Sequence, residues 1–202
     1  MNDQPVKPPE QRPEHPDFWN KRFNEGVTPW EAGRAPALLK AFAAQHPDGM
    51  ATLIPGCGSA HDAAWLAAQG WPVTALDFSP TAIEQAGAVL GTAAVDLRCA
   101  DFFNFPPERS YQLIYERAFL CALPRKLWAD WARRVAALLP AGGYLAGFFF
   151  ICNQPKGPPF GISREEIEAL LGPNFNRHED LPVDDSIPVF AGRERWQVWR
   201  RR

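Results

Sequence analysis

The sequence predicts an α/β fold with an open, mostly parallel sheet and helices on both faces. Short apolar segments typical of strands alternate with segments typical of helices, which is the pattern of parallel strands joined by crossover helices. The last two predicted strands have no helix between them, so we expect an antiparallel hairpin at one edge of the sheet. The chain has 202 residues, 46% of them hydrophobic, which suits one domain of ordinary size with a substantial core.

The amino-terminal part should differ from the rest. Residues 1–16 are rich in proline and polar groups, which disfavour a helix interior and bury little apolar surface, so we expect a flexible arm. A single domain is expected over residues 17–202. Within it, Asp17 can cap a first short helix, and a second helix is predicted over about 35–45.

From residue 51 onward the predicted elements alternate. Ser79 and Pro80 are typical of the start of a helix, and Ser163 with Glu166 has the spacing of a capping box. The predicted helices are "HDAAWLAAQG", "SPTAIEQAGAVL", "PRKLWADWARRVAALLPAGG" and "SREEIEALLG". The predicted strands are "ATLIP", "WPVTALD", "VDLRCAD", "YQLIYE", "GYLAGFFFI", "NRHEDLPV" and "RERWQVWR".

Composition narrows the class of function. The net charge of −2 argues against a general nucleic-acid-binding protein, which usually carries a basic stripe. None of the four cysteines stands in a CxxC pair, so a zinc ribbon or a thioredoxin-like motif is not expected, nor is any other metal site. The first residues lack the apolar core of a signal peptide, and "YLAGFFFIC" is too short to span a bilayer. We therefore expect a cytoplasmic protein with reduced thiols, no membrane or nucleic-acid partner, and a monomeric state.

The stretch "ATLIPGCGSAHDAAWLAAQG" indicates a cofactor site. In an open α/β sheet, ligands bind outside the carboxyl ends of the strands, and a glycine turn after the first strand lets the backbone approach the ligand. Gly56 and Gly58 supply such a turn, but His61 stands where a dinucleotide fingerprint would have a third glycine. No GKS or GKT follows, which excludes a P-loop.

Acidic residues at the ends of the next two strands favour one cofactor. Asp77 lies 21 residues after Gly56, where a carboxylate can accept the hydrogen bonds of a ribose diol. Asp101 and Phe102 end the following strand, where an acid and an aromatic ring can contact adenine. This order suits S-adenosylmethionine better than a dinucleotide, although capping by Asp77 and a turn role for Asp101 are the structural alternatives.

These motifs together resemble the thiopurine S-methyltransferase family, including its plant halide and thiol methyltransferase branch. The resemblance implies a Rossmann-like class I methyltransferase domain with a seven-stranded sheet and an antiparallel last strand. It extends from about residue 18 to residue 172 and rests on "FWNKRFNEGVTPWEAGRAPALL", "LIPGCGSAHDAAWLAAQGWPVTALDFSPTAIEQA", "CADFFNF", "YQLIYERAFLCALP", "LLPAGGYL" and "GPPFGIS".

The resemblance also implies roles for individual residues. The segment 17–45 would act as a lid over the cofactor. Arg117 corresponds to an arginine beside the substrate in the thiopurine branch, so we expect it to position the acceptor, the alternative being an ion pair with Glu116 or another acid. We expect the cofactor to contact Trp19, Trp30, Gly56, Gly58, Asp77, Asp101 and Phe102, and the acceptor pocket to contain Phe23, Arg117 and Phe160.

The expected activity is transfer of a methyl group from S-adenosylmethionine to a small soft nucleophile, most favourably a thiol or a thiopurine, with S-adenosylhomocysteine as product. Methyl transfer from a sulfonium requires mainly positioning and desolvation, so no strong base is needed. Halide, selenium or tellurium acceptors remain open, because "PGCGSAHD" is more similar to the halide branch. A protein that binds S-adenosylmethionine without reacting is the alternative from another class.

Overall fold

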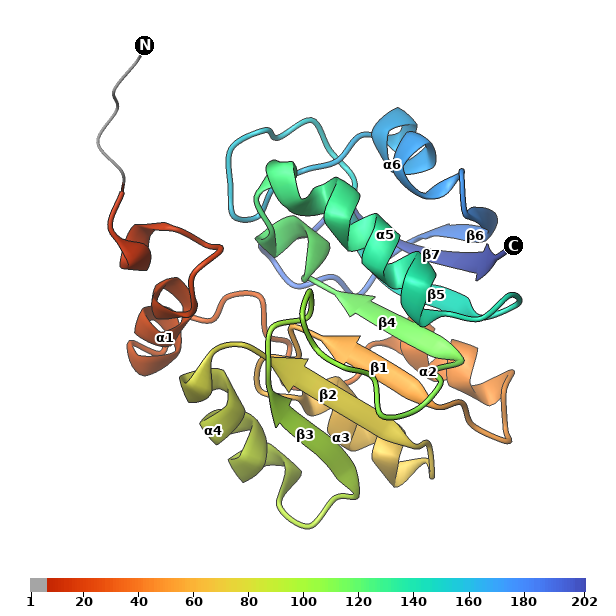
Figure 1. Cartoon of the computed structure of the whole chain (residues 1–202), viewed down its shortest axis with the longest axis horizontal. Helices are drawn as coiled ribbons and strands as arrows, with labels where there is room; N and C mark the ends of the chain where they lie inside the picture. Colours follow the sequence, from red (N-terminus) through yellow and green to blue (C-terminus); the bar gives the residue numbers. More distant parts are fainter. Residues whose placement is uncertain (1–6) are drawn as a thin grey trace.

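One seven-stranded sheet forms the centre of the molecule in the computed structural model, which describes residues 7–202 (Figure 1). The strand order is β3-β2-β1-β4-β5-β7-β6. Neighbouring strands are parallel except that β7 is antiparallel to both β5 and β6. The strands are β1 (Thr52–Pro55), β2 (Val73–Asp77), β3 (Val95–Cys99), β4 (Leu113–Arg117), β5 (Tyr144–Phe150), β6 (Phe175–Pro182) and β7 (Glu194–Arg201).

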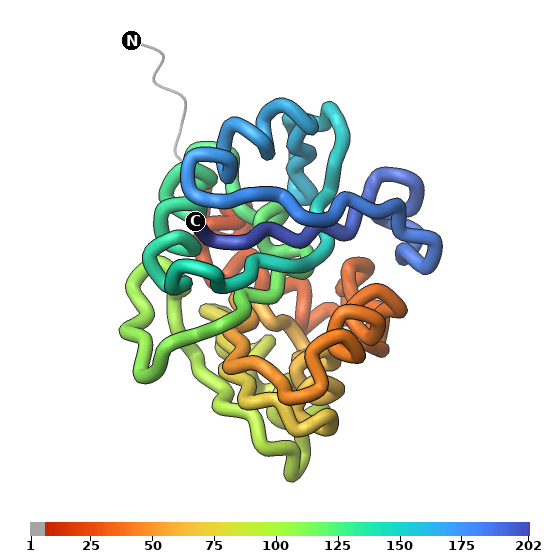
Figure 2. The backbone as a smooth tube through the Cα atoms, turned by 90° about the vertical axis from the view of Figure 1, so that its right-hand side faces the viewer, coloured from red at the N-terminus to blue at the C-terminus, as the bar shows by residue number. Residues whose placement is uncertain are grey.

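The predicted terminal hairpin is confirmed, with one detail that the sequence did not define. β7 lies between β5 and β6, so β6 forms the edge. Figure 2 shows this pair in blue at one end of the sheet, with the helix–strand units around residues 61–99 at the other end. The antiparallel last strand is therefore an interior strand, which explains why its central residues are buried.

Helices cover both faces of the sheet, as predicted (Figure 1). The long predicted helix around residue 130 begins at Trp128 and is preceded by a 3-10 turn over Arg125–Leu127. No helix within residues 7–202 is long and apolar enough to cross a membrane. The α-helices are α1 (Pro16–Asn24), α2 (Ala37–Ala44), α3 (His61–Ala68), α4 (Pro80–Leu90), α5 (Trp128–Leu138) and α6 (Arg164–Leu171).

Two hydrophobic cores form because successive side chains of a strand point to opposite faces of the sheet. Ile114 and Leu145 face the core that α5 and α6 cover, whereas Leu113, Tyr115 and Ala146 face the core beneath α2, α3 and α4. All five side chains are fully buried. The sheet is thus apolar on both faces, as expected for parallel strands between two helical layers.

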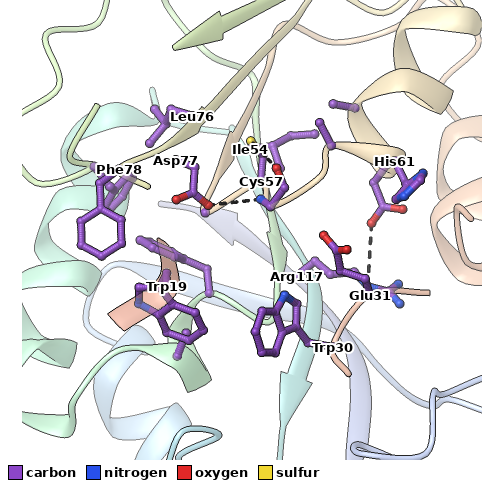
Figure 3. Close-up of a pocket in the computed structure, with 18 of the residues that line it drawn as sticks. Trp19, Trp30, Glu31, Ile54, Cys57, His61, Leu76, Asp77, Phe78 and Arg117 are labelled. Atoms are coloured by element: carbon purple, nitrogen blue, oxygen red, sulfur yellow. Dashed lines mark hydrogen bonds and ion pairs between the residues drawn. The ribbon is translucent and has the colours of Figure 1, made fainter. Parts of the chain in front are cut away.

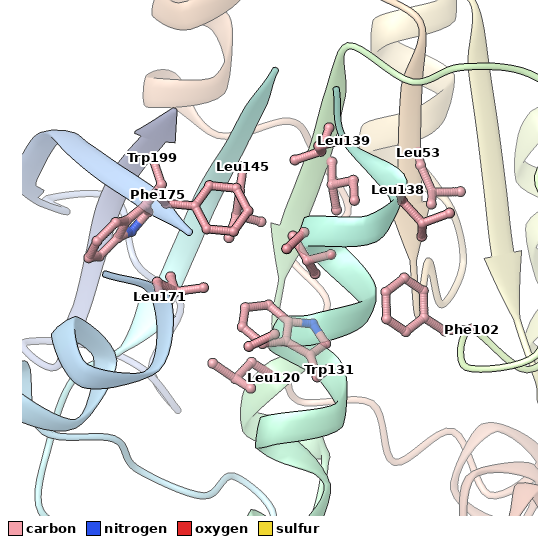
Figure 4. Close-up of a cluster of buried hydrophobic side chains, with 14 of the residues drawn as sticks. Leu53, Phe102, Leu120, Trp131, Leu138, Leu139, Leu145, Leu171, Phe175 and Trp199 are labelled. Carbon is pink, nitrogen blue, oxygen red and sulfur yellow. The ribbon is translucent and has the colours of Figure 1, made fainter. Parts of the chain in front are cut away.

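Trp131 of α5 is central to the first core (Figure 4). It is 0% exposed, and Trp128 in the same helix is also buried. Truncating a buried tryptophan to alanine typically costs about 3–5 kcal/mol, so α5 contributes much of the stability of this face. Trp65 of α3 is half-buried against the second core.

Of the three predicted helix caps, those at Ser79 and Ser163 are confirmed, whereas α1 begins at Pro16 after His15, so Asp17 lies within its first turn and does not cap it. The Ser79 hydroxyl accepts a hydrogen bond from the amide of Ala82 at 3.2 Å. The Ser163 hydroxyl accepts from the Glu166 amide at 3.1 Å, and the Glu166 carboxylate accepts from the Ser163 amide at 2.8 Å. These contacts satisfy amide groups that have no partner within the helix. The capping residue Ser79 also places the start of α4 directly after β2.

The amino-terminal segment lies beyond the carboxyl ends of the central strands (Figure 1). Its helix α1 contacts α4 and its capping residue through three hydrogen bonds. Asn20 Oδ1 accepts from the Ser79 hydroxyl at 2.6 Å and from the Thr81 amide at 3.4 Å, and the Gln85 side-chain amide donates to the Phe23 carbonyl at 3.1 Å. Ahead of α1, the Lys126 ammonium pairs with Glu14 at 2.7 Å. The predicted flexible arm falls partly outside the described residues, which begin at residue 7.

Candidate active site

A cavity of about 130 Å³ lies where the direction of strand succession reverses, outside the carboxyl ends of β1, β2 and β4. This reversal is where ligands bind in open α/β sheets. Its walls come from the turn after β1, from the ends of β2, β3 and β4, and from the amino-terminal segment (Figure 3). Of the residues that the sequence assigned to a site, the cavity is lined by Trp19, Phe23, Trp30, Gly56, Gly58, Asp77, Asp101, Phe102 and Arg117.

Phe160 is the exception, because it does not line this cavity. It is half-buried and packs against the core beneath α5 and α6. Its backbone amide donates to the carbonyl of Cys121 at 2.7 Å, which fixes the segment after the prolines at 158 and 159. The local sequence could not distinguish these two environments, since both are apolar and both lie near the carboxyl end of the sheet.

The turn after β1 has the backbone that its glycines predicted. Gly56 and Gly58 have φ values of +60° and +53°, a region that side chains with a Cβ rarely adopt. A Cβ at Gly56 would stand 2.4 Å from the ring of Phe119, so the close approach itself also requires glycine. Ala60 ends the turn with φ +60° and leads directly into α3.

Asp77 holds the other side of this turn. Its Oδ2 accepts from the Gly58 amide at 3.2 Å and its Oδ1 accepts from the Ser79 amide at 2.9 Å. Burial, with a smaller contribution from the carboxylate of Glu31, raises its pKa to about 6 against these hydrogen bonds. A carboxylate can accept about four hydrogen bonds, so capacity remains for the hydroxyl groups of a ribose. The residues present therefore fit the nucleoside of S-adenosylmethionine.

The expected adenine side is formed by the turn after β3. Asp101 accepts from the Phe103 amide at 3.0 Å and from the Asn104 side chain at 2.7 Å, so its carboxylate also shapes the turn. Phe102 is 2% exposed and makes an edge-to-face contact with Phe119, with ring centroids 5.4 Å apart. Phe102 thus belongs to the core while one side of it borders the cavity.

Aromatic rings from the amino-terminal segment form the outer wall of the cavity (Figure 3). Trp30 makes edge-to-face contacts with Trp19 and Phe23, with centroid distances of 5.4 Å and 5.9 Å. The indole N–H of Trp19 donates to the carbonyl of Pro13 at 2.8 Å, which orients the ring. This wall is apolar and separates the glycine turn from solvent on that side.

Arg117 is the cationic group at the end of β4. Its partner is Asp62 in the first turn of α3, at 3.8 Å, and its guanidinium lies 4.7 Å from the centroid of the Phe148 ring. Asp62 also accepts from the Tyr115 hydroxyl at 2.9 Å. Burial raises the pKa of Asp62, and the charge of Arg117 opposes that rise. Arg117 lines the cavity, and among residues 7–202 its buried Nη1 has no hydrogen-bond partner.

The expected alternative for Arg117, an ion pair with an acid, is present with Asp62, whereas Glu116 has another role. The Glu116 carboxylate accepts from the amides of Phe119 and Leu120, at 2.8 Å and 2.9 Å. It therefore caps the 3-10 turn that begins at Leu120 instead of pairing with its neighbour. Burial raises the pKa of Glu116 to about 7 against these two hydrogen bonds.

Among the lining residues that were not predicted as site residues, three make contacts that shape the site. Glu31 reaches the glycine turn from the amino-terminal segment, and its Oε1 accepts from the Ser59 amide at 2.8 Å. Asp62, which the helix dipole alone could explain, pairs with Arg117. Phe119 packs under Gly56. Only Asp62 carried a sequence signal, because its place at the start of a helix after the glycine turn puts it at the carboxyl edge of the sheet.

Comparison with known proteins finds a family whose members are similar to this chain over most of its length. A family model described as thiopurine S-methyltransferase (TPMT) matches residues 14–202. A probable thiol methyltransferase 2 of Arabidopsis thaliana is 32% identical over 191 residues, which cover 91% of this chain and 84% of that protein. A thiopurine S-methyltransferase of Xanthomonas campestris is 31% identical over 184 residues, covering 81% of this chain and 84% of its own length.

Solved structures confirm the fold. The Burkholderia thailandensis 1,6-didemethyltoxoflavin-N1-methyltransferase, crystallised with S-adenosylhomocysteine, superposes with a TM-score of 0.75 at 18% identity, covering 98% of this chain and 92% of that one. Magnesium protoporphyrin IX methyltransferase from Synechocystis PCC 6803 superposes with a TM-score of 0.69 at 16% identity, covering 93% and 99%. At such identities the similarity shows the fold, which is the predicted class I methyltransferase sheet.

Proposed function

The chain belongs to the thiopurine S-methyltransferase family, and on that basis we propose that its acceptor is a small thiol or thiopurine held as an anion by Arg117. The protein is an S-adenosylmethionine-dependent methyltransferase acting on a small soft nucleophile. One observation supports the choice of acceptor: the guanidinium of Arg117, at the end of β4, lines the cavity and has a nitrogen without a hydrogen-bond partner within residues 7–202. A guanidinium binds an anionic group by charge and hydrogen bonds together.

The strand order suggests how the cofactor lies. Asp101 and Phe102 follow β3, Asp77 ends β2, the glycine turn follows β1, and Arg117 ends β4. Since these strands are adjacent in the order β3-β2-β1-β4, a ligand with adenine at β3 and ribose at β2 would place its methionine part over the glycine turn. Its reactive methyl group, between the ribose and the methionine part, would then lie on the side of the cavity that Arg117 borders.

The residues that line the cavity would position the two reactants and exclude water from them. Bound S-adenosylmethionine would supply an activated methyl group on its sulfonium. Arg117, oriented by Asp62 and the Phe148 ring, would hold the acceptor sulfur as the thiolate in line with that methyl group. Trp19 and Trp30 would exclude water and offer their rings to the sulfonium, an attraction of roughly 0.5–2 kcal/mol.

The test is a panel of acceptors with radiolabelled S-adenosylmethionine, scored by kcat/KM. We expect an aromatic thiol and a thiopurine to exceed iodide and thiocyanate by at least about 10-fold, because an enclosed apolar wall favours a larger apolar nucleophile. Higher values for iodide or thiocyanate would contradict the proposed acceptor. Tight binding of S-adenosylhomocysteine with no methylated product from any acceptor would indicate a non-catalytic binding protein.

We also propose, from the sequence expectations, that the protein acts as a monomer in the cytoplasm on a small molecule, without nucleic acid. The net charge of −2 and the scattered basic residues support the last point. Light scattering on the purified protein tests the monomeric state, and retention on heparin at low salt tests the absence of nucleic-acid affinity.

A further inference from the structure

Glu31 reaches the glycine turn from a distant part of the chain. Its Oε1 accepts from the Ser59 amide at 2.8 Å and lies 3.0 Å from the point where a Cβ on Gly58 would stand. On the other side of the same turn, Asp77 accepts from the amide of Gly58 at 3.2 Å. Two carboxylates from different segments therefore hold consecutive amides of one turn, and both border the cavity.

This arrangement leaves negative charge beside the cavity. Glu31 makes no ion pair with any residue from 7 to 202, whereas Arg117, which also lines the cavity, pairs with Asp62. Glu31 also raises the pKa of Asp77, because two carboxylates at one turn repel each other. A ligand that brings a positive charge to this turn would relieve the repulsion and bind more tightly for that reason.

The proposed path of the cofactor says which positive charge arrives there. If adenine and ribose occupy the ends of β3 and β2, the part of the cofactor over the turn after β1 is its amino-acid end, which carries an ammonium group. Resting on the proposed function, we infer that Glu31 binds this ammonium group. Because Glu31 follows Trp30 directly, the same contact would join the aromatic wall to the bound cofactor.

The test compares two ligands on one conservative variant. Glu31→Gln keeps an oxygen that can accept from the Ser59 amide but removes the charge. Calorimetry would measure S-adenosylhomocysteine and S-adenosyl-4-thiobutyrate, the analogue that lacks only the amino group. We expect the variant to bind S-adenosylhomocysteine about 10- to 100-fold more weakly, from the usual strength of a hydrogen bond to a charged group, and to bind the analogue as the wild type does.

The matched control is Glu25→Gln, an exposed glutamate at the end of α1, which should leave both affinities unchanged. Equal losses for both ligands in Glu31→Gln would overturn the inference and assign Glu31 to support of the turn. Unchanged affinity for S-adenosylhomocysteine would also overturn it. If the wild type itself binds neither ligand, the proposed function fails before the role of Glu31 is reached.

Discussion

Protonation of Asp77 should weaken cofactor binding. The carboxylate is 8% exposed, and its burial raises its pKa to about 6 in the free protein, well above its ordinary value of 3.8. The two hydroxyl groups of a ribose would donate to this carboxylate, and such hydrogen bonds favour the ionised form. The complex therefore requires ionised Asp77, whereas the free protein is half protonated near pH 6. Binding should release a proton, and affinity should rise with pH until it levels off above that value.

The size of the effect follows from the pKa. One pH unit below a pKa of about 6, roughly nine-tenths of the free protein carries the proton, so the affinity at pH 5 should be about 10-fold weaker than at pH 8. Asp77→Asn removes the titration but keeps one acceptor oxygen. We expect this variant to lose about 1–3 kcal/mol of binding free energy at pH 8. Its remaining affinity should depend less on pH than that of the wild type.

The assay is calorimetry of S-adenosylhomocysteine binding from pH 5 to pH 8 in two buffers of different ionisation enthalpy, which also counts released protons. Circular dichroism at each pH would establish that both proteins remain folded. An affinity for the wild type that does not change across this range would refute the reasoning. So would an equal pH dependence in Asp77→Asn, because the titrating group would then be another residue.

Three further predictions concern other parts of the site. Arg117→Met should lower kcat/KM toward an acidic thiol by about 10- to 100-fold and leave cofactor affinity nearly unchanged. A variant that loses thermal stability but turns over acceptors normally would show that Arg117 has a structural role only. Residues 10–33 should be protected from limited proteolysis by S-adenosylhomocysteine, since lids close over such sites, and equal cleavage rates would argue against a lid. In denaturant unfolding, Gly56→Ala should cost more than the roughly 1–2 kcal/mol of backbone strain expected for Gly70→Ala, because only at Gly56 would the new Cβ meet the ring of Phe119. Equal losses would show that the ring moves aside.

The fold was predictable because it depends on short-range patterns. The glycine turn, the cap at Ser79 and the capping box at Ser163 each need only a few neighbouring residues. The position of β7 between β5 and β6 was not predictable, because a hairpin pattern says which strands pair but not on which side the hairpin joins the sheet.

The site was predictable where topology alone brings residues together. Asp77 and Arg117 end parallel strands, and the ends of such strands meet at one edge of the sheet. Glu31 could not be found in this way, because its contact with Ser59 depends on how a loop without regular structure returns over the sheet. Phe160 could not be placed for the same reason, because the local sequence around an aromatic residue in a loop does not differ between a ring that enters the cavity and one that packs in the core.

Cys57 lies between the two turn glycines, and its surroundings suppress the reaction of its thiol with a methylating agent. Its thiol borders the cavity in which a methylating agent for sulfur nucleophiles would bind. Burial raises the pKa of this thiol well above its ordinary value, and the charges of Asp77 and Glu31 raise it further. Since the thiolate is the reactive form, Cys57 remains protonated and nearly inert at neutral pH. Burial, with a smaller contribution from the two carboxylates at the turn, thus keeps the sulfur of Cys57 in the form that does not compete with an acceptor thiolate for the methyl group.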